Sequence, residues 1–165
     1  MGMVLYLRRA SAADIDQVKG HPDQLDDFMF DEADASDDLV DLDKAWHGVH
    51  YLLTGSADAT DSPLSLLIGN WESFGQNQHG FGGGWIVPPP AMQAFHTALA
   101  ALDDETLTAR YDPAAMNAEQ VYLADAFVEE SPEEALEYIL QGLPNLRRFA
   151  ARCASSDTGA IIVLQ

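Results

Sequence analysis

The sequence contains very little cysteine, and this shortage excludes two ways of stabilising a fold. Cys153 is the only cysteine among the 165 residues. The chain therefore forms no internal disulfide and no cysteine-rich zinc site. With 47% hydrophobic residues, a chain of this length buries enough surface to fold without either. We expect one domain over residues 1–165.

Long apolar runs are also missing. No stretch approaches the roughly 20 apolar residues that a membrane-spanning helix needs. The N-terminal "MGMVLYLRRASAAD" has a short apolar run with its arginines after it, whereas a secretory signal peptide has its basic residues first. These features predict a soluble bacterial protein of the cytoplasm, with no membrane partner.

Basic residues are scarce. The chain has 8 Lys and Arg against 27 Asp and Glu, a formal net charge of −19, and none of the basic residues lies between Lys44 and Arg110. Binding to a nucleic-acid backbone needs clustered Lys and Arg, so we expect no nucleic-acid partner. A field of this sign attracts basic proteins. The alternative interpretation is that the acidity only keeps the protein soluble.

The acidic residues are densest between Lys19 and Lys44, where ten occur without a basic residue among them. A calcium-binding EF-hand loop needs glycine at its sixth position and glutamate at its twelfth. Counted from Asp34, those positions hold Leu39 and Ala45, so the motif fails. We expect a helix that begins at Pro22 and ends in the solvated acidic turn "ADASDD".

The remaining pattern predicts an α+β fold, mostly helical, with a small sheet. "MVLYLRR" and the terminal "GAIIVLQ" have the branched and aromatic residues of buried strands, and we expect these two strands to pair. Ser11 and Ser131 are predicted to begin helices, because each is followed three residues later by an acidic residue. "SPLSLLIGN" predicts a short helix with Ser62 as its cap and Pro63 at its first position.

The stretch "DLDKAWHGVHYLLTG", residues 41–55, predicts an amphipathic helix. Trp46, Val49, His50 and Leu53 recur at the spacing of one helical face. Asp41 is in position to cap the start of this helix, and a glycine follows its end.

The order of several segments resembles the YfbM-like family of bacterial proteins of unknown function. These segments are "LDKAWHGVHYLLTG", "PLSLLIGN", a glycine-rich turn into a helix, "YDPAAMNAEQVY" and "GAIIVLQ". The resemblance covers nearly the whole chain and implies a single α+β domain in a bacterial cytosol. It supplies no catalytic residues.

His47 and His50 are the first candidates for a site. Residues three apart on a helix are neighbours, so both side chains could reach one metal ion. A zinc site would need further ligands, such as His79, His96 or Asp43, whose positions no motif fixes. We favour a structural role for both, with His50 hydrogen-bonded in the core and His47 at an interface. We therefore predict no metal site and no cofactor.

No pattern identifies a nucleophile. The serine-hydrolase motif G-x-S-x-G is missing, and Cys153 lies on an apolar helical face, where a reactive thiolate is not stabilised. The glycine-rich "HGFGGGW" lacks the lysine and the following helix of a phosphate loop. It suits either a plain turn or a ligand contact built from His79, Phe81 and Trp85. We assign no catalytic residue.

Two hypotheses follow. The first is a non-enzymatic acidic binding protein, of which an immunity-like protein is one example, with a basic protein as its partner. The second is a small-molecule-binding protein or enzyme with a pocket between helix 41–54 and the loop 79–85. The sequence gives no signal of oligomeric state. The candidate ligand or partner surface comprises Trp46, His47, His50, His79, Phe81 and Trp85.

Overall fold

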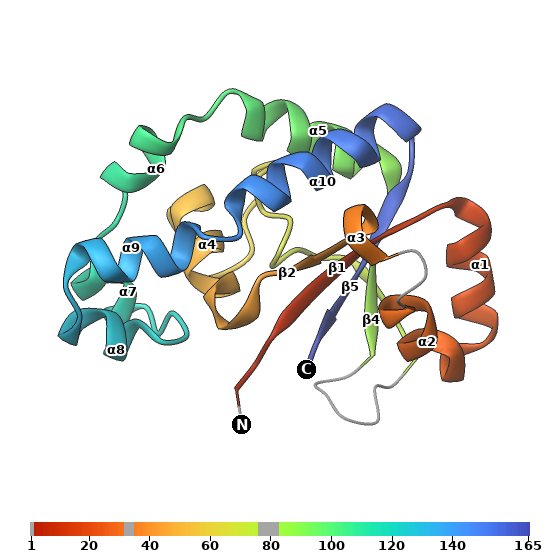
Figure 1. Ribbon diagram of the computed structural model, residues 1–165, viewed down its shortest axis with the longest axis horizontal. Helices are drawn as coiled ribbons and strands as arrows, with labels where there is room; N and C mark the ends of the chain where they lie inside the picture. Colours follow the sequence, from red (N-terminus) through yellow and green to blue (C-terminus); the bar gives the residue numbers. More distant parts are fainter. Residues whose placement is uncertain (1, 32–34, 76–82) are drawn as a thin grey trace.

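A five-stranded antiparallel sheet forms the centre of the molecule (Figure 1). The computed structural model describes residues 2–31, 35–75 and 83–165. The strand order is β2-β1-β5-β4-β3. The strands are β1 (Leu5–Ala10), β2 (Leu39–Asp41), β3 (Glu72–Phe74), β4 (Gly84–Val87) and β5 (Gly159–Leu164). The predicted α+β class, with more helix than strand, is confirmed.

The two longest strands, β1 and β5, lie next to each other in the middle of the sheet. Their register runs from the pair Leu5 and Leu164 to the pair Ala10 and Gly159. The prediction that the first and last strands pair is therefore confirmed. β5 is buried over almost its whole length because helices cover both faces of the sheet, which explains why its sequence is apolar without alternation.

Helices make up most of the rest of the chain. They are α1 (Ala12–Gly20), α2 (Leu25–Phe30), α3 (Ala35–Asp38), α4 (Trp46–Thr54), α5 (Pro89–Ala100), α6 (Asp104–Ala109), α7 (Pro113–Ala118), α8 (Ala124–Glu129), α9 (Pro132–Leu140) and α10 (Leu143–Ser156). Two short 3-10 turns, Pro22–Gln24 and Asp43–Ala45, precede α2 and α4.

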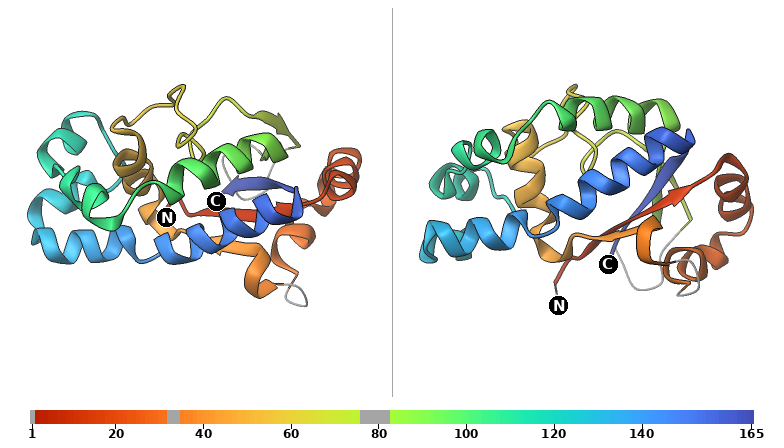
Figure 2. Two further views of the ribbon diagram at one scale, coloured as in Figure 1. Left: turned by 90° about the horizontal axis from the view of Figure 1, so that it is seen from above. Right: turned by 45° about the horizontal axis from the view of Figure 1, so that its top comes forward.

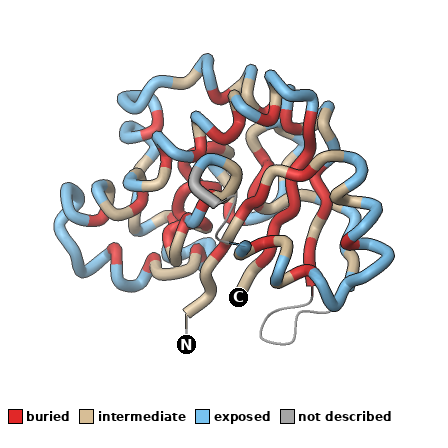
Figure 3. The backbone as a smooth tube through the Cα atoms, turned by 45° about the vertical axis from the view of Figure 1, so that its right-hand side comes forward, coloured by how far each residue is buried: buried red, intermediate tan, exposed pale blue. Residues whose placement is uncertain are grey.

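Each face of the sheet has its own apolar core. α5 and α10 run side by side over one face, and α1 and α2 lie on the other (Figures 1 and 2). Because side chains alternate along a strand, Leu7 and Ile162 enter the larger core under α5 and α10, whereas Ile161 and Val163 enter the smaller one. Buried residues accordingly concentrate along the strands (Figure 3).

Helices α6 to α9 form an arm that extends to one side of the sheet (Figure 1). Side-chain caps begin three of these short helices: Asp103 caps α6, Asp112 caps α7 and Ser131 caps α9. The predicted helix start at Ser131 is confirmed, as is the start of α1 at Ser11, which forms a reciprocal capping box with Asp14.

The predicted helix starts at Asp41 and Ser62 are wrong. Asp41 does not cap α4. It is the last residue of β2, and its carboxylate accepts a hydrogen bond from the Asp43 backbone N–H. Ser62 accepts from the Leu64 N–H, but the chain forms only a turn there and no helix follows.

The helix predicted from Pro22 is shorter than expected. The structure has the 3-10 turn there, followed by α2, which ends at Phe30. Residues 32–34 lie outside the described part of the chain.

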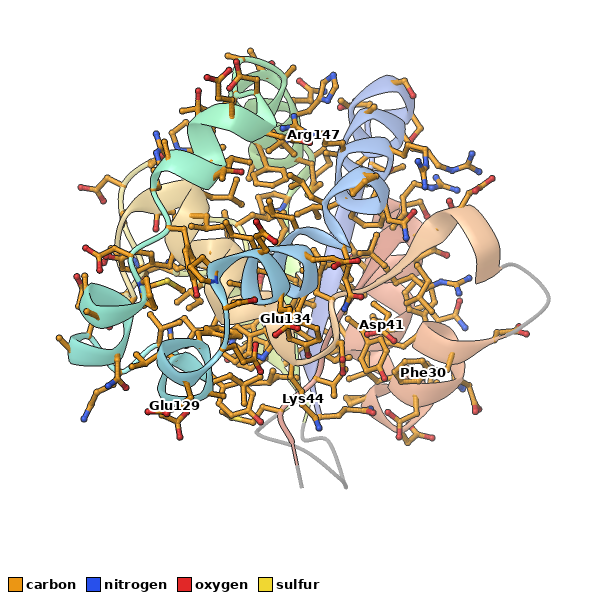
Figure 4. All side chains as sticks on the ribbon, turned by 60° about the vertical axis from the view of Figure 1, so that its left-hand side comes forward. Phe30, Asp41, Lys44, Glu129, Glu134 and Arg147 are labelled. Atoms are coloured by element: carbon orange, nitrogen blue, oxygen red, sulfur yellow. The ribbon has the colours of Figure 1, made fainter. Side chains whose placement is uncertain are left out.

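Arg147 joins α10 to the end of α5. Its guanidinium donates hydrogen bonds of 2.8 Å to the carbonyl oxygens of Leu99 and Leu102, and it lies 3.3 Å from Asp104. The last carbonyls of a helix have no partner within the helix, so a cation there satisfies them and complements the helix dipole. Figure 4 shows Arg147 where the two helices meet.

We predict that Arg147→Met lowers the free energy of unfolding by about 1 to 3 kcal/mol, because two partly buried carbonyls lose a charged donor. The matched control is Arg148→Met, whose guanidinium hydrogen-bonds to Asn145 on its own helix. Urea unfolding of the two variants measures the difference. Equal losses would show that Arg147 does not support the end of α5.

Candidate functional site

All three tryptophans of the chain line one cavity of about 260 Å³, which we call the tryptophan cavity. They are Trp46 at the start of α4, Trp71 just before β3 and Trp85 in β4. The other described residues that line the cavity are Leu5, Leu67, Ile68, Gly69, Ile162 and Leu164.

The sheet forms the floor of the tryptophan cavity. Leu5 pairs with Leu164 and Trp85 pairs with Ile162, so these four side chains lie on one face of neighbouring strands. α5 and α10 cover the same face, but no residue of either helix is among the lining residues. The cavity therefore lies at the end of the sheet where β1 begins and β5 ends.

Trp46 is held in place by a hydrogen bond and by ring contacts with His47 and with Tyr122, the latter with the centroids 6.2 Å apart. Its indole N–H donates a 3.0 Å hydrogen bond to the Met3 carbonyl oxygen. Its ring stacks on the His47 imidazole, with the centroids 4.9 Å apart and the planes 5° from parallel. The side chain is 7% exposed. Trp46 is thus both a buried residue of the larger core and part of the cavity lining.

The segment 65–71 covers the cavity and is stiffened by a buried serine. The Ser65 hydroxyl donates to the Ile68 carbonyl oxygen at 2.6 Å and accepts from the Thr60 backbone N–H at 3.0 Å. Trp71 donates its indole N–H to the Leu66 carbonyl oxygen at 2.8 Å. A Cβ atom at Gly69 would lie 2.5 Å from that indole nitrogen, so only glycine leaves room for the ring.

His47 is a structural link between three segments. Its Nε2 lies 2.8 Å from the Ala57 carbonyl oxygen, and its Nδ1 lies 2.9 Å from the Tyr122 backbone nitrogen. A carbonyl can only accept and an N–H can only donate, so His47 is neutral with its proton on Nε2. Burial lowers the pKa of His47, which favours the same neutral form.

His50 is fully buried. Its Nε2 donates a 2.9 Å hydrogen bond to the Asp58 carbonyl oxygen, and its Nδ1 has no hydrogen-bond partner in the described part of the chain. Burial lowers the pKa of His50 as well. His50 is not among the residues that line the cavity. The structure thus places Trp46 and Trp85 together in a cavity and leaves His50 beside it, in the core.

Among the described residues, no further candidate lines this cavity. His79 and Phe81 lie outside the described residues. Among residues 2–31, 35–75 and 83–165, no group of three or more His, Cys, Asp or Glu could hold a metal ion. Cys153 is buried, as predicted, and burial raises its pKa to about 12, so the thiol stays protonated at neutral pH.

Sequence reasoning missed Trp71. It lies in "GNWESF", where no helix or strand period places it against the other two tryptophans. The only signal was Gly69 two residues earlier, since a glycine beside an aromatic residue is common where a ring approaches the backbone. Leu67 and Ile68 were missed for a related reason, because the predicted short helix would have pointed them elsewhere.

Comparison with known proteins identifies the family. The family model described as a domain of unknown function, DUF1877, matches residues 1–163. The chain belongs to this family. The DUF1877 fold is also seen in the crystal structure of YfbM, a protein of unknown function from Escherichia coli. That structure superposes with a TM-score of 0.71 at 21% identity, over 97% of this chain and 98% of that one.

None of the curated proteins compared with this DUF1877 chain matches it. The predicted YfbM-like family is confirmed, and the likeness to YfbM supports the fold alone. In the described part of the chain, no helix has the length and apolar character needed to cross a membrane.

The two neutral histidines predict how stability depends on pH. The pKa of each is lowered from 6.5 in the folded protein, so the unfolded chain takes up these protons first as the pH falls. The free energy of unfolding should therefore decrease below about pH 6.5, until each folded-state pKa is reached, and should be unaffected above it. The slope can reach about 1.4 kcal/mol per pH unit for each histidine.

Urea unfolding of wild type, His47→Gln and His50→Gln between pH 5 and 7.5 measures this dependence. Each variant should show a shallower slope than wild type. Identical slopes in all three proteins would contradict the prediction.

Proposed function

We propose that this protein binds a small ligand in the tryptophan cavity and does not catalyse a reaction on it. The observation that carries the proposal is the convergence of all three tryptophans on one cavity, from three segments separated in sequence. The described lining contains no titratable side chain. General acid–base catalysis needs such a group within hydrogen-bond reach, so binding without chemistry fits the lining better.

The cavity size and lining indicate the kind of ligand. Pockets for drug-sized molecules hold about 300 to 1,000 Å³, and this cavity is smaller, so its ligand is small. The described lining is almost entirely apolar and aromatic, as is usual for small-molecule pockets, in which a few polar groups orient the ligand.

Polar contacts from the protein are few. Two of the three indole N–H groups are already bonded to backbone carbonyls, those of Met3 and Leu66. The Trp85 N–H has no partner among the described residues, so it is the one tryptophan donor left for a ligand. Shape and apolar contact therefore contribute more to the proposed binding than hydrogen bonds do.

The indole N–H resonances of the three tryptophans provide a direct test. All three residues line the cavity, so each signal in a 1H–15N spectrum reports on its occupancy. Toluene, as a small apolar probe, should shift all three signals saturably. Ile68→Phe, which adds bulk inside the cavity, should weaken this response at least about tenfold, whereas Val128→Phe on the exposed part of α8 should not. Linear, unsaturable shifts, identical in both variants, would refute the proposal.

A second candidate function is binding of a basic protein, and the charge of the arm favours it. Residues 111–146, which include α7 to α9 of the arm, contain eight Asp and Glu, all exposed, and no Lys or Arg. None of the eight forms an ion pair within the described residues. Glu129 and Glu134 lie on α8 and α9 of this arm (Figure 4). Unpaired surface charge of one sign accelerates association with a protein of the opposite charge.

The immunity-like role has no observation of its own and stays a prediction.

If the arm binds a basic protein, charge removed from the arm should weaken binding more than the same charge removed elsewhere. Glu133→Gln/Glu137→Gln on α9 should weaken binding of a lysine-rich peptide at low salt more than Asp16→Asn/Asp23→Asn near α1 does. Both pairs remove two exposed charges, so net charge is matched. Fluorescence anisotropy of the labelled peptide measures the two affinities. Equal losses would mean that only the total charge matters and that the arm is no binding surface.

A further inference from the structure

We propose that the ligand of the tryptophan cavity is an organic cation whose charge is shielded by alkyl groups, namely a quaternary ammonium group of the choline type. This inference rests on the proposed binding function and specifies its ligand class. It combines the aromatic lining, the charge of the protein and the lack of polar side chains in the cavity.

The aromatic lining suits a cation. The face of an indole carries negative potential, and tryptophan attracts a cation more strongly than the other aromatic side chains do. The rings of Trp71 and Trp85 make no ring contact with another aromatic residue of the described chain. Trp46 also contacts the rings of His47 and Tyr122, and His47 is neutral, so it does not cancel that potential. All three indoles border the cavity of about 260 Å³, and in this proposal they form an aromatic cage around the cation.

The charge of the protein determines the sign of the ligand. The net charge is −19, and no Lys or Arg occurs among the described lining residues. The nearest lysine in sequence to Trp46 is Lys44, whose side chain lies against Gly2. A field of this sign attracts cations and repels anions at the entrance of the cavity.

The lining also determines which cations fit. A metal ion or a primary ammonium keeps its hydration or needs hydrogen-bond acceptors, and burying it without them is costly. The described lining offers no carboxylate, amide or hydroxyl side chain. A quaternary ammonium has no N–H to satisfy and presents methyl groups to Leu5, Leu67 and Leu164. It combines positive charge with an apolar surface, as the cavity requires.

The decisive experiment compares choline with 3,3-dimethylbutan-1-ol, in which carbon replaces the quaternary nitrogen. The two molecules have the same shape and differ by one charge. Titration of the three indole N–H signals at low salt should show choline binding roughly tenfold more tightly than its neutral analogue. Added salt should reduce this preference, because it screens the field of the protein.

Variants of Trp85 test the cage directly. Choline affinity should fall in the order wild type, Trp85→Phe, Trp85→Leu, whereas affinity for the neutral analogue should change much less. Trp46 and Trp71 supply the reporting signals in these variants. Phe30→Leu, which removes an aromatic ring packed against Tyr6 in the smaller core, is the matched control and should bind choline like wild type.

The outcomes separate this inference from the proposed function. Tighter binding of choline than of the neutral analogue supports the inference. Equal binding of the two in wild type overturns the cation while leaving ligand binding in the cavity intact. If choline, its neutral analogue and toluene all fail to bind saturably, both the inference and the proposed function are overturned. The wild-type comparison is decisive even if a Trp85 variant unfolds, as its melting curve would show.

Discussion

The pairing of β1 with β5 is the interaction on which the rest of the structure depends. It joins the first and last strands, Leu5 to Leu164, into the middle of the sheet. On one face, their side chains enter the larger core and form the floor of the tryptophan cavity. On the other face, they enter the smaller core under α1 and α2. Both apolar cores and the floor of the tryptophan cavity thus depend on the same backbone hydrogen bonds between β1 and β5.

The cavity is a consequence of how the larger face is covered. α5 and α10 pack over it without reaching the end where β1 begins, and Arg147 fixes their relative position. Segment 65–71 spans that end as an irregular chain held by Ser65. An irregular segment does not interdigitate with a sheet as a helix does, so aromatic side chains border the gap instead of filling it.

His47 and His50, the first candidates for a site, have a structural role: they hold α4, which carries Trp46, against the segment that follows it. His47 and His50 bond to the carbonyl oxygens of Ala57 and Asp58 and so tie α4 to the chain that follows it. Both are neutral because burial disfavours their charged forms. No Asp or Glu is buried in the described part of the chain, whereas Arg8, at 6% exposed, is buried. The described surface is thus strongly negative, and Arg8 is the one buried Lys or Arg among the described residues.

The sequence by itself determined the α+β class, the pairing of its terminal strands, the caps at Ser11 and Ser131 and the burial of Cys153. These features follow from composition, apolar runs and hydrogen bonds between near neighbours, all of which are local in sequence. Only the tertiary structure decided that Trp46, Trp71 and Trp85 meet and that His50 stays out of the cavity. That outcome depends on strand register and on an irregular segment whose hydrogen bonds obey no period. Contacts between distant segments are set by the packing of the whole chain, which no local pattern encodes.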